Sequence, residues 1–138
     1  MRAKVEVQVT EQEPEAGVRE TPDEWLVNDL LQIDITEIGT SLVLSLRGEL
    51  DANTAPQLRQ QLIGRTAPGR RLVIDTTDLQ FCGSSGLAVF LEGQQEAENR
   101  DAQLRIVVLP GNPLRRVLGA VGLLDVLPIT PDLDSALR

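Results

Sequence analysis

An alternation of apolar and polar residues begins at Leu31 and predicts two neighbouring strands. Leu31, Ile33 and Ile35 alternate with polar side chains, which is the spacing of a strand with one buried face. After the turn signal Gly39-Thr40, apolar residues recur at every second position from Leu42 to Leu46. Because the connection is short, the two strands are expected to form an antiparallel hairpin.

Helix and strand patterns alternate over the rest of the chain. A helix is expected after Asp51 or Asn53, either of which would cap it, because apolar residues then recur at helical spacing. One hairpin followed by β-α-β units predicts an α/β fold with a mixed sheet of about five strands and helices mainly on one face. Further strands are expected at 72–76, 104–109 and 126–129, and further helices at 84–99, 113–119 and 131–137, the last capped by Thr130.

The N-terminal segment differs in composition from the rest of the chain. The first thirty residues hold eight acidic and three basic side chains, a net charge of −5. Because little of this segment can be buried, residues 1–28 are expected to be a flexible acidic tail and 29–138 a single domain. Two features suggest local order: Val5, Val7 and Val9 alternate as in a short strand, and Trp25-Leu26-Val27 could dock on the domain.

Composition narrows the classes of function. The net charge of −8 repels the phosphates of nucleic acids and anionic membranes. The chain has no His and a single Cys, Cys82, which excludes a Ser-His-Asp triad, a His-ligated metal and an intramolecular disulfide. No run of about 18 apolar residues is present to span a membrane. We therefore expect a cytoplasmic, soluble protein with no nucleic-acid or membrane partner, no metal and no cofactor.

The candidate chemistry lies where the strand that begins at Leu72 meets the helix at 84–99. At such a turn hydroxyls are exposed and the first N–H groups of the helix lack partners. The run Gly83-Ser84-Ser85-Gly86 does not have the Gly-x-Ser-x-Gly spacing of esterases, and no His is present as a base. No phosphate-binding glycine motif occurs, so the chain is not expected to be an enzyme. Taken alone, Ser84 and Ser85 are interpreted as helix caps.

Two motifs in a fixed order change this interpretation. The first is Gly48-Glu49-Leu50-Asp51 followed by Thr54-Ala55-Pro56, and the second runs from Asp75 to Leu87. A helix and a strand of fitting length join them. This arrangement resembles the STAS domain, and more narrowly the bacterial anti-sigma factor antagonists, over about residues 30–138.

The resemblance implies a partner-switching protein. In the family, the unmodified antagonist binds an anti-sigma factor that is also a serine kinase, and the sigma factor is freed for transcription. The kinase phosphorylates the serine at the start of the second helix, which ends the complex, and a phosphatase resets it. The matching serine here is Ser84. The implied contact surface consists of Asp51, Asn53, Thr54, Gly83, Ser85 and Gly86.

The chain departs from the family at Gly83, where an Asp is usual. Two alternatives follow from this departure and from the exposed loop. One is a constitutive scaffold of the same fold that is not phosphorylated. The other is a sensor that binds a small molecule or nucleotide through loop N–H groups. For Asp51, Asn53 and Thr54, capping of the first helix is the alternative role.

Overall fold

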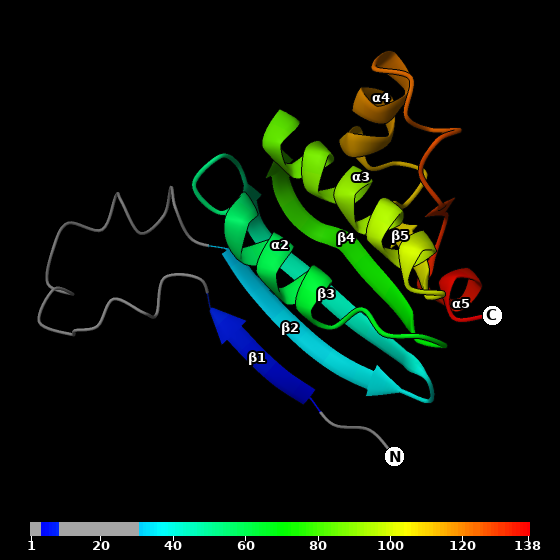
Figure 1. Cartoon of the computed structure of the whole chain (residues 1–138). Coiled ribbons are helices and arrows are strands. Elements are labelled where there is room, and N and C mark those ends of the chain that lie inside the picture. The colour runs from blue at the N-terminus through cyan, green and yellow to red at the C-terminus, as the bar shows by residue number, and fades with distance from the viewer. Residues whose placement is uncertain (1–3, 9–30) are drawn as a thin grey trace, which may run out of the picture.

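In the computed structural model, which describes residues 4–8 and 31–138, six strands form one mixed sheet in the order β1-β2-β3-β4-β5-β6 (Figure 1). The pairs β1–β2 and β2–β3 are antiparallel, whereas β3–β4, β4–β5 and β5–β6 are parallel. The strands are β1 (Lys4–Gln8), β2 (Leu31–Ile38), β3 (Ser41–Leu50), β4 (Arg71–Cys82), β5 (Gln103–Val107) and β6 (Ile129–Thr130).

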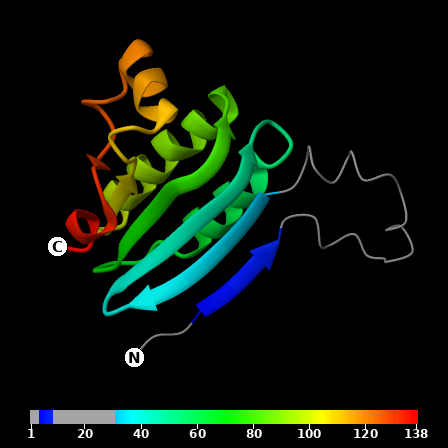
Figure 2. The ribbon, with the colours of Figure 1, turned by 180° about the vertical axis from the view of Figure 1, so that it is seen from behind.

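Four helices accompany the sheet in the described residues: α2 (Ala55–Gly64), α3 (Ser84–Asn99), α4 (Pro113–Ala120) and α5 (Leu133–Ala136). Helices α2 and α3 lie side by side on one face of the sheet (Figure 1), and the view from behind shows the strands in front of them (Figure 2). Within the described part of the chain, no helix combines the length and the apolar character that a membrane crossing requires.

The β2–β3 hairpin follows from the alternation in its sequence. Ile33 pairs with Leu46 and Ile35 pairs with Leu44, so both strands turn their apolar side chains to the same face. All four side chains are buried in the main core, beneath α2 and α3. The turn between the strands contains Gly39, whose φ of 61° is a conformation that glycine adopts without strain. The predicted antiparallel hairpin is therefore confirmed.

A smaller core lies on the opposite face of the sheet. Val43, Val73 and Val107, from three neighbouring strands, are buried there against Ala136 of α5. This second contact explains the almost continuous apolar run at the start of β4, because that strand is covered on both faces. The predicted α/β fold, with helices mainly on one face, is confirmed, and α5 is the helix on the other face.

Several predicted boundaries and one predicted cap were wrong. Strand β4 does not end at Asp75 or Thr76 but continues to Cys82, because β3 pairs with it along its whole length across two register shifts. The strand expected at 104–109 ends at Val107, and the last strand comprises Ile129–Thr130 instead of 126–129. The last helix is shorter than 131–137 and comprises Leu133–Ala136. Helix α5 is capped by the Asp132 carboxylate, which accepts from the Ser135 N–H at 2.8 Å, and not by Thr130.

The sheet contains one strand, β1, that belongs neither to the hairpin nor to the β-α-β units. Residues Lys4–Gln8 form β1 and pair with β2, as the alternation of Val5 and Val7 allowed. Val9 and Trp25-Leu26-Val27 lie outside the described residues. The flexible tail over 1–28 and the domain boundary at 29 therefore stay predictions.

Leu50 fixes the position of α3 relative to the ends of β3 and β4. It pairs with Cys82 across the parallel strands, and its carbonyl accepts from the Gly83 N–H at 2.9 Å. Its side chain is fully buried against Gly86, where an added Cβ would lie 2.5 Å from Leu50 Cδ2 and 2.9 Å from Cys82 Sγ. Only a residue without a side chain lets the helix approach this closely.

Replacing Gly86 by Ala should therefore destabilise the domain. The added methyl group would overlap the buried side chains of Leu50 and Cys82, and overpacking of this kind costs about 1–3 kcal/mol of the free energy of unfolding. Urea denaturation followed by circular dichroism measures this. The matched control is Gly64→Ala in α2, where nothing lies within 4 Å and where Ala should be neutral or stabilising by up to about 1 kcal/mol. Equal stability of the two variants would contradict the packing argument.

Candidate functional site

Two chain segments meet where β3 and β4 end. The loop at 51–54 follows β3, and residues 83–86 follow β4 and begin α3. Because parallel neighbours end at the same edge of a sheet, Leu50 and Cys82 bring the segments together, and the hydrogen bond from Gly83 to Leu50 joins them directly. We call residues 51–54 and 83–86 together the serine site. The structure thus assembles all the residues that the sequence predicted for it.

The first half of the serine site is a loop held by its own side chains. One oxygen of the Asp51 carboxylate accepts from the N–H groups of Asn53 at 2.9 Å and Thr54 at 3.1 Å. The Thr54 hydroxyl accepts from the Asp51 N–H at 3.0 Å and donates to the Glu49 carbonyl at 2.9 Å. Thr54 is 1% exposed, whereas Ala52 and Asn53 are exposed. Asp51 and Thr54 therefore shape the loop, and Ala52 and Asn53 form its surface.

These bonds also settle how α2 begins. The residue at the N-cap is Thr54, and its side chain makes no capping bond to the helix. Pro56 lies in the first turn, where its missing N–H leaves no bond unmade. Capping of α2 by the side chain of Asp51 or Asn53 is therefore wrong, because the Asp51 carboxylate serves the loop that precedes the helix.

The second half of the site is the first turn of α3. Gly83 is the N-cap and has no side chain to offer, so Ser84 and Ser85 are the first two helical residues. Their interpretation as caps is wrong. The N–H groups of Ser84 and Ser85 find no acceptor among the described residues, because Gly83 precedes them without a capping oxygen. Ser84 is exposed, Ser85 is half-buried and Gly86 is buried. The outermost hydroxyl of the site belongs to Ser84.

Phe81 is a member of this neighbourhood that the sequence pattern did not indicate. Its side chain is 53% exposed, and its ring lies 3.3 Å from the position that a Cβ on Gly83 would occupy. Aromatic side chains are enriched in protein contact surfaces. The sequence signal for Phe81 was the alternation of Leu79 and Phe81 with the polar Gln80, which is the spacing of a strand.

A shallow hollow of about 300 Å³ extends the site along the two helices. It is bordered by Ala52 and Pro56 on one side and by Ser85 and Ala88 on the other. It is also lined by Arg59 of α2 and Glu92 of α3, which form a salt bridge at 2.7 Å between two largely exposed side chains. The sequence could not indicate this pair, since 33 positions separate its members. The hollow and the salt bridge extend the surface of the serine site along α2 and α3.

The Cys82 thiol, next to the serine site, is shielded from solvent. Burial raises the pKa of the Cys82 thiol to about 12, so it stays protonated at neutral pH and is a poor nucleophile. No group of three His, Cys, Asp or Glu side chains in the described residues is arranged to hold a metal ion. Among the described residues, the Ser84 hydroxyl and the N–H groups of Ser84 and Ser85 form no hydrogen bond, which suits modification and protein contact.

Comparison with known proteins agrees with this architecture. The family model "Mlab, STAS domain" matches residues 33–129. The chain is 33% identical to the anti-sigma F factor antagonist of Paenibacillus polymyxa, with 78% of this chain and 92% of that protein covered. It is 29% identical to the anti-sigma-F factor antagonist RsfA of Mycobacterium tuberculosis, with 89% and 94% covered.

A solved structure shows the same fold. The crystal structure of an anti-sigma factor antagonist from Mycobacterium paratuberculosis superposes with a TM-score of 0.68 at 28% identity, covering 79% of this chain and 92% of that one. The family model matches more than half of the chain, and the relatives are matched over nearly their whole length. The chain therefore belongs to the STAS domain family, among the bacterial anti-sigma factor antagonists.

Proposed function

We propose that this domain binds an anti-sigma factor with serine kinase activity through the serine site, and that phosphorylation of Ser84 ends the complex. Binding would free a sigma factor for transcription, and a phosphatase would restore the unmodified protein. The observation that carries the proposal is the exposed Ser84 hydroxyl at the first position of α3, bonded to no described residue. The names of the relatives, antagonists of anti-sigma factors, support the choice of partner.

The fold should tolerate a phosphate at this position. Phosphorylation adds about −1.5 to −2 charges at neutral pH. The start of α3 accommodates an anion, because its dipole is positive there and the N–H groups of Ser84 and Ser85 are free to donate. No acidic residue lies in the first turn to oppose the new charge. Modification should therefore leave the sheet and helices in place.

The contact surface, unlike the fold, should not tolerate a phosphate on Ser84. The exposed residues around Ser84 include the small or apolar Ala52, Ala88 and Phe81 beside the uncharged Asn53. A partner that covers these side chains would have to desolvate the phosphate or meet it with its own charge. A penalty of about 3–4 kcal/mol would weaken binding by between two and three orders of magnitude. A local charge can thus release the partner without unfolding the domain.

Of the predicted contact residues, the structure favours direct contact for the exposed ones. Asn53 and Ser85 are accessible at the surface of the serine site, as is the main chain at Gly83. Thr54 and Gly86 are buried, and Asp51 uses its carboxylate within the loop. We therefore assign Asp51, Thr54 and Gly86 to shaping the surface that the partner covers.

Incubation with the cognate anti-sigma kinase and ATP should add one phosphate to the protein. The expected mass increase is measured on the intact chain, and Ser84→Ala should abolish it. The matched control is Ser85→Ala, which removes the neighbouring, half-buried hydroxyl and should still be modified. Modification that persists in Ser84→Ala and disappears in Ser85→Ala would move the switch to Ser85.

The Ser84→Asp variant should bind the anti-sigma factor more weakly than the wild type, by about tenfold or more. The carboxylate brings a single negative charge to the contact surface, and each factor of ten in affinity corresponds to about 1.4 kcal/mol. Isothermal titration calorimetry measures the affinity, and Ser84→Asn controls for the change in shape. Equal affinities for the wild type and for Ser84→Asp would rule out release by charge.

Gly83 favours a second candidate function, a constitutive binder that is not phosphorylated. The position offers no carboxylate, and the Phe81 ring lies 3.3 Å from where a Cβ would be. The Gly83→Asp variant separates the two candidates. If the wild type gains no phosphate under conditions in which Gly83→Asp does, Gly83 has removed the modification, and the domain is a constitutive binder. Rapid modification of the wild type contradicts this second candidate.

A further inference from the structure

Strand β4 has an edge that the sheet leaves open. It pairs with β3 as far as Cys82, but its pairing with β5 ends at Asp75, opposite Val107. Beyond that point, the side chain of Asn112 donates to the Thr76 carbonyl at 3.4 Å. No described strand follows along β4 between Thr77 and Cys82 on this side. Main-chain groups at such an edge are available to pair with another chain.

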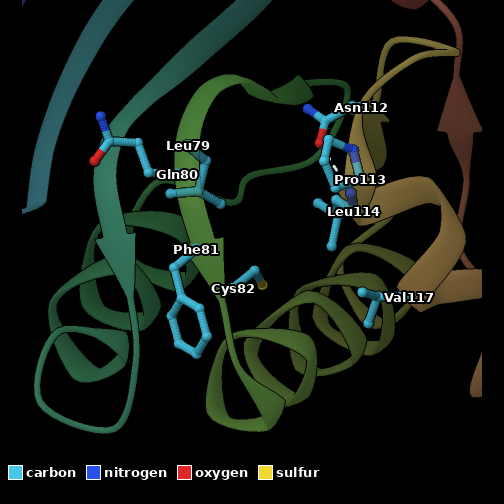
Figure 3. A pocket seen from close by; sticks show the side chains of 8 residues that line it. All are labelled: Leu79, Gln80, Phe81, Cys82, Asn112, Pro113, Leu114 and Val117. Carbon is cyan, nitrogen blue, oxygen red and sulfur yellow. Dashed lines mark hydrogen bonds between the residues drawn. The ribbon is translucent and has the colours of Figure 1, made fainter.

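A groove of about 200 Å³ separates this edge from α4. Leu79 and Cys82 line it from the strand, and Pro113, Leu114 and Val117 line it from the helix (Figure 3). Gln80 and Phe81 also border the groove, yet their side chains point away from α4 (Figure 3). The main chain of β4 therefore forms part of its wall. The groove combines apolar side chains with a stretch of strand backbone that no described strand pairs on this side.

The groove continues into a basic hollow at the start of α4. This hollow, of about 360 Å³, shares Asn112 and Pro113 with the groove and is lined further by Arg115 and Arg116. Among the described residues neither arginine forms an ion pair. They place two positive charges side by side at this hollow, in a chain of net charge −8. They complement an acidic group on whatever occupies the groove.

We propose that the groove binds an extended peptide segment of a partner protein, in which an apolar side chain is followed or preceded by an acidic one. The segment adds to the open edge of β4, so main-chain hydrogen bonds supply affinity. Its apolar side chain lies between Leu79 and Val117, and its carboxylate meets Arg115 and Arg116. This surface is separate from the serine site, although Cys82 and Gly83 make the two contiguous along the chain.

The proposal is tested by selecting binders from a displayed library of random short peptides on the wild-type protein. The enriched sequences should combine apolar and acidic residues. A synthetic peptide of the enriched sequence, titrated into the isotope-labelled protein, should shift the amide resonances of 77–82 and 114–117. Val117→Asp, which places a carboxylate on the groove wall, should weaken binding by about tenfold or more.

Two matched variants make the result specific. Val121 is also an exposed valine, 54% against 41% for Val117, but it does not line the groove, so Val121→Asp should bind the peptide as the wild type does. Ser84→Asp should also bind it normally, which separates this surface from the proposed switch. A folded Val117→Asp variant has an unchanged amide spectrum outside the groove, so loss of binding is distinguished from loss of fold.

Three outcomes would overturn the proposal. The first is enrichment of basic sequences or of none. The second is a set of shifted resonances that lies over α2 and the start of α3 instead of the groove. The third is the appearance of the same shifts on raising the concentration of the protein alone, which would show that a second copy of the chain covers the groove.

Discussion

The contact of Leu50 with Gly86 is the constraint on which the serine site depends. Leu50 is the last residue of β3. Its carbonyl accepts from the Gly83 N–H, its backbone pairs with Cys82, and its side chain packs against Gly86. These three contacts fix the positions of Gly83, Cys82 and Gly86. The start of α3 is consequently attached to the end of β3 as firmly as to β4, from which the chain enters the helix. A serine placed on this frame keeps its position whatever happens to its hydroxyl.

This separation of frame and surface is what the proposed switch at Ser84 requires. The buried residues of the site, Thr54, Gly86 and Leu50, carry the packing and the loop hydrogen bonds. The exposed ones, Asn53 and Ser84, carry no bond from their side chains to the rest of the described structure. In the proposed switch, a charge added at the surface changes what the site binds, while the free energy of unfolding depends on the buried residues beneath it.

The unequal lengths of the strands give β4 a second role. Because β3 follows β4 to its end and β5 does not, the two edges of the same strand differ. One edge leads, through Leu50, to the serine site, and the other faces α4 across an open groove. Both surfaces lie at the end of one central strand, which is buried on both faces along its first half. A rigid strand thus supports two neighbouring surfaces of different chemistry.

Much of this architecture could be predicted from local pattern. The alternation over Leu31–Ile35 and Leu42–Leu46 specified the hairpin, and the helical spacing after Gly83 specified α3 with both of its ends correct. The position of Ser84 at a strand-to-helix turn followed from the same patterns. Each of these features depends on residues close together in the sequence, where the periodicity of side chains reports directly on the backbone.

Tertiary structure decided the rest, because the interactions concerned join distant parts of the chain. The polar run from Asp75 to Asp78 does not resemble a strand, and only pairing with β3 makes it one. Likewise, no local signal shows that Thr54 is buried, that Arg59 bonds Glu92 or that α4 faces the open edge of β4. By itself, the sequence determined that a serine begins α3. The packing of Leu50 on Gly86 decided which loop borders that serine and which residues remain exposed beside it.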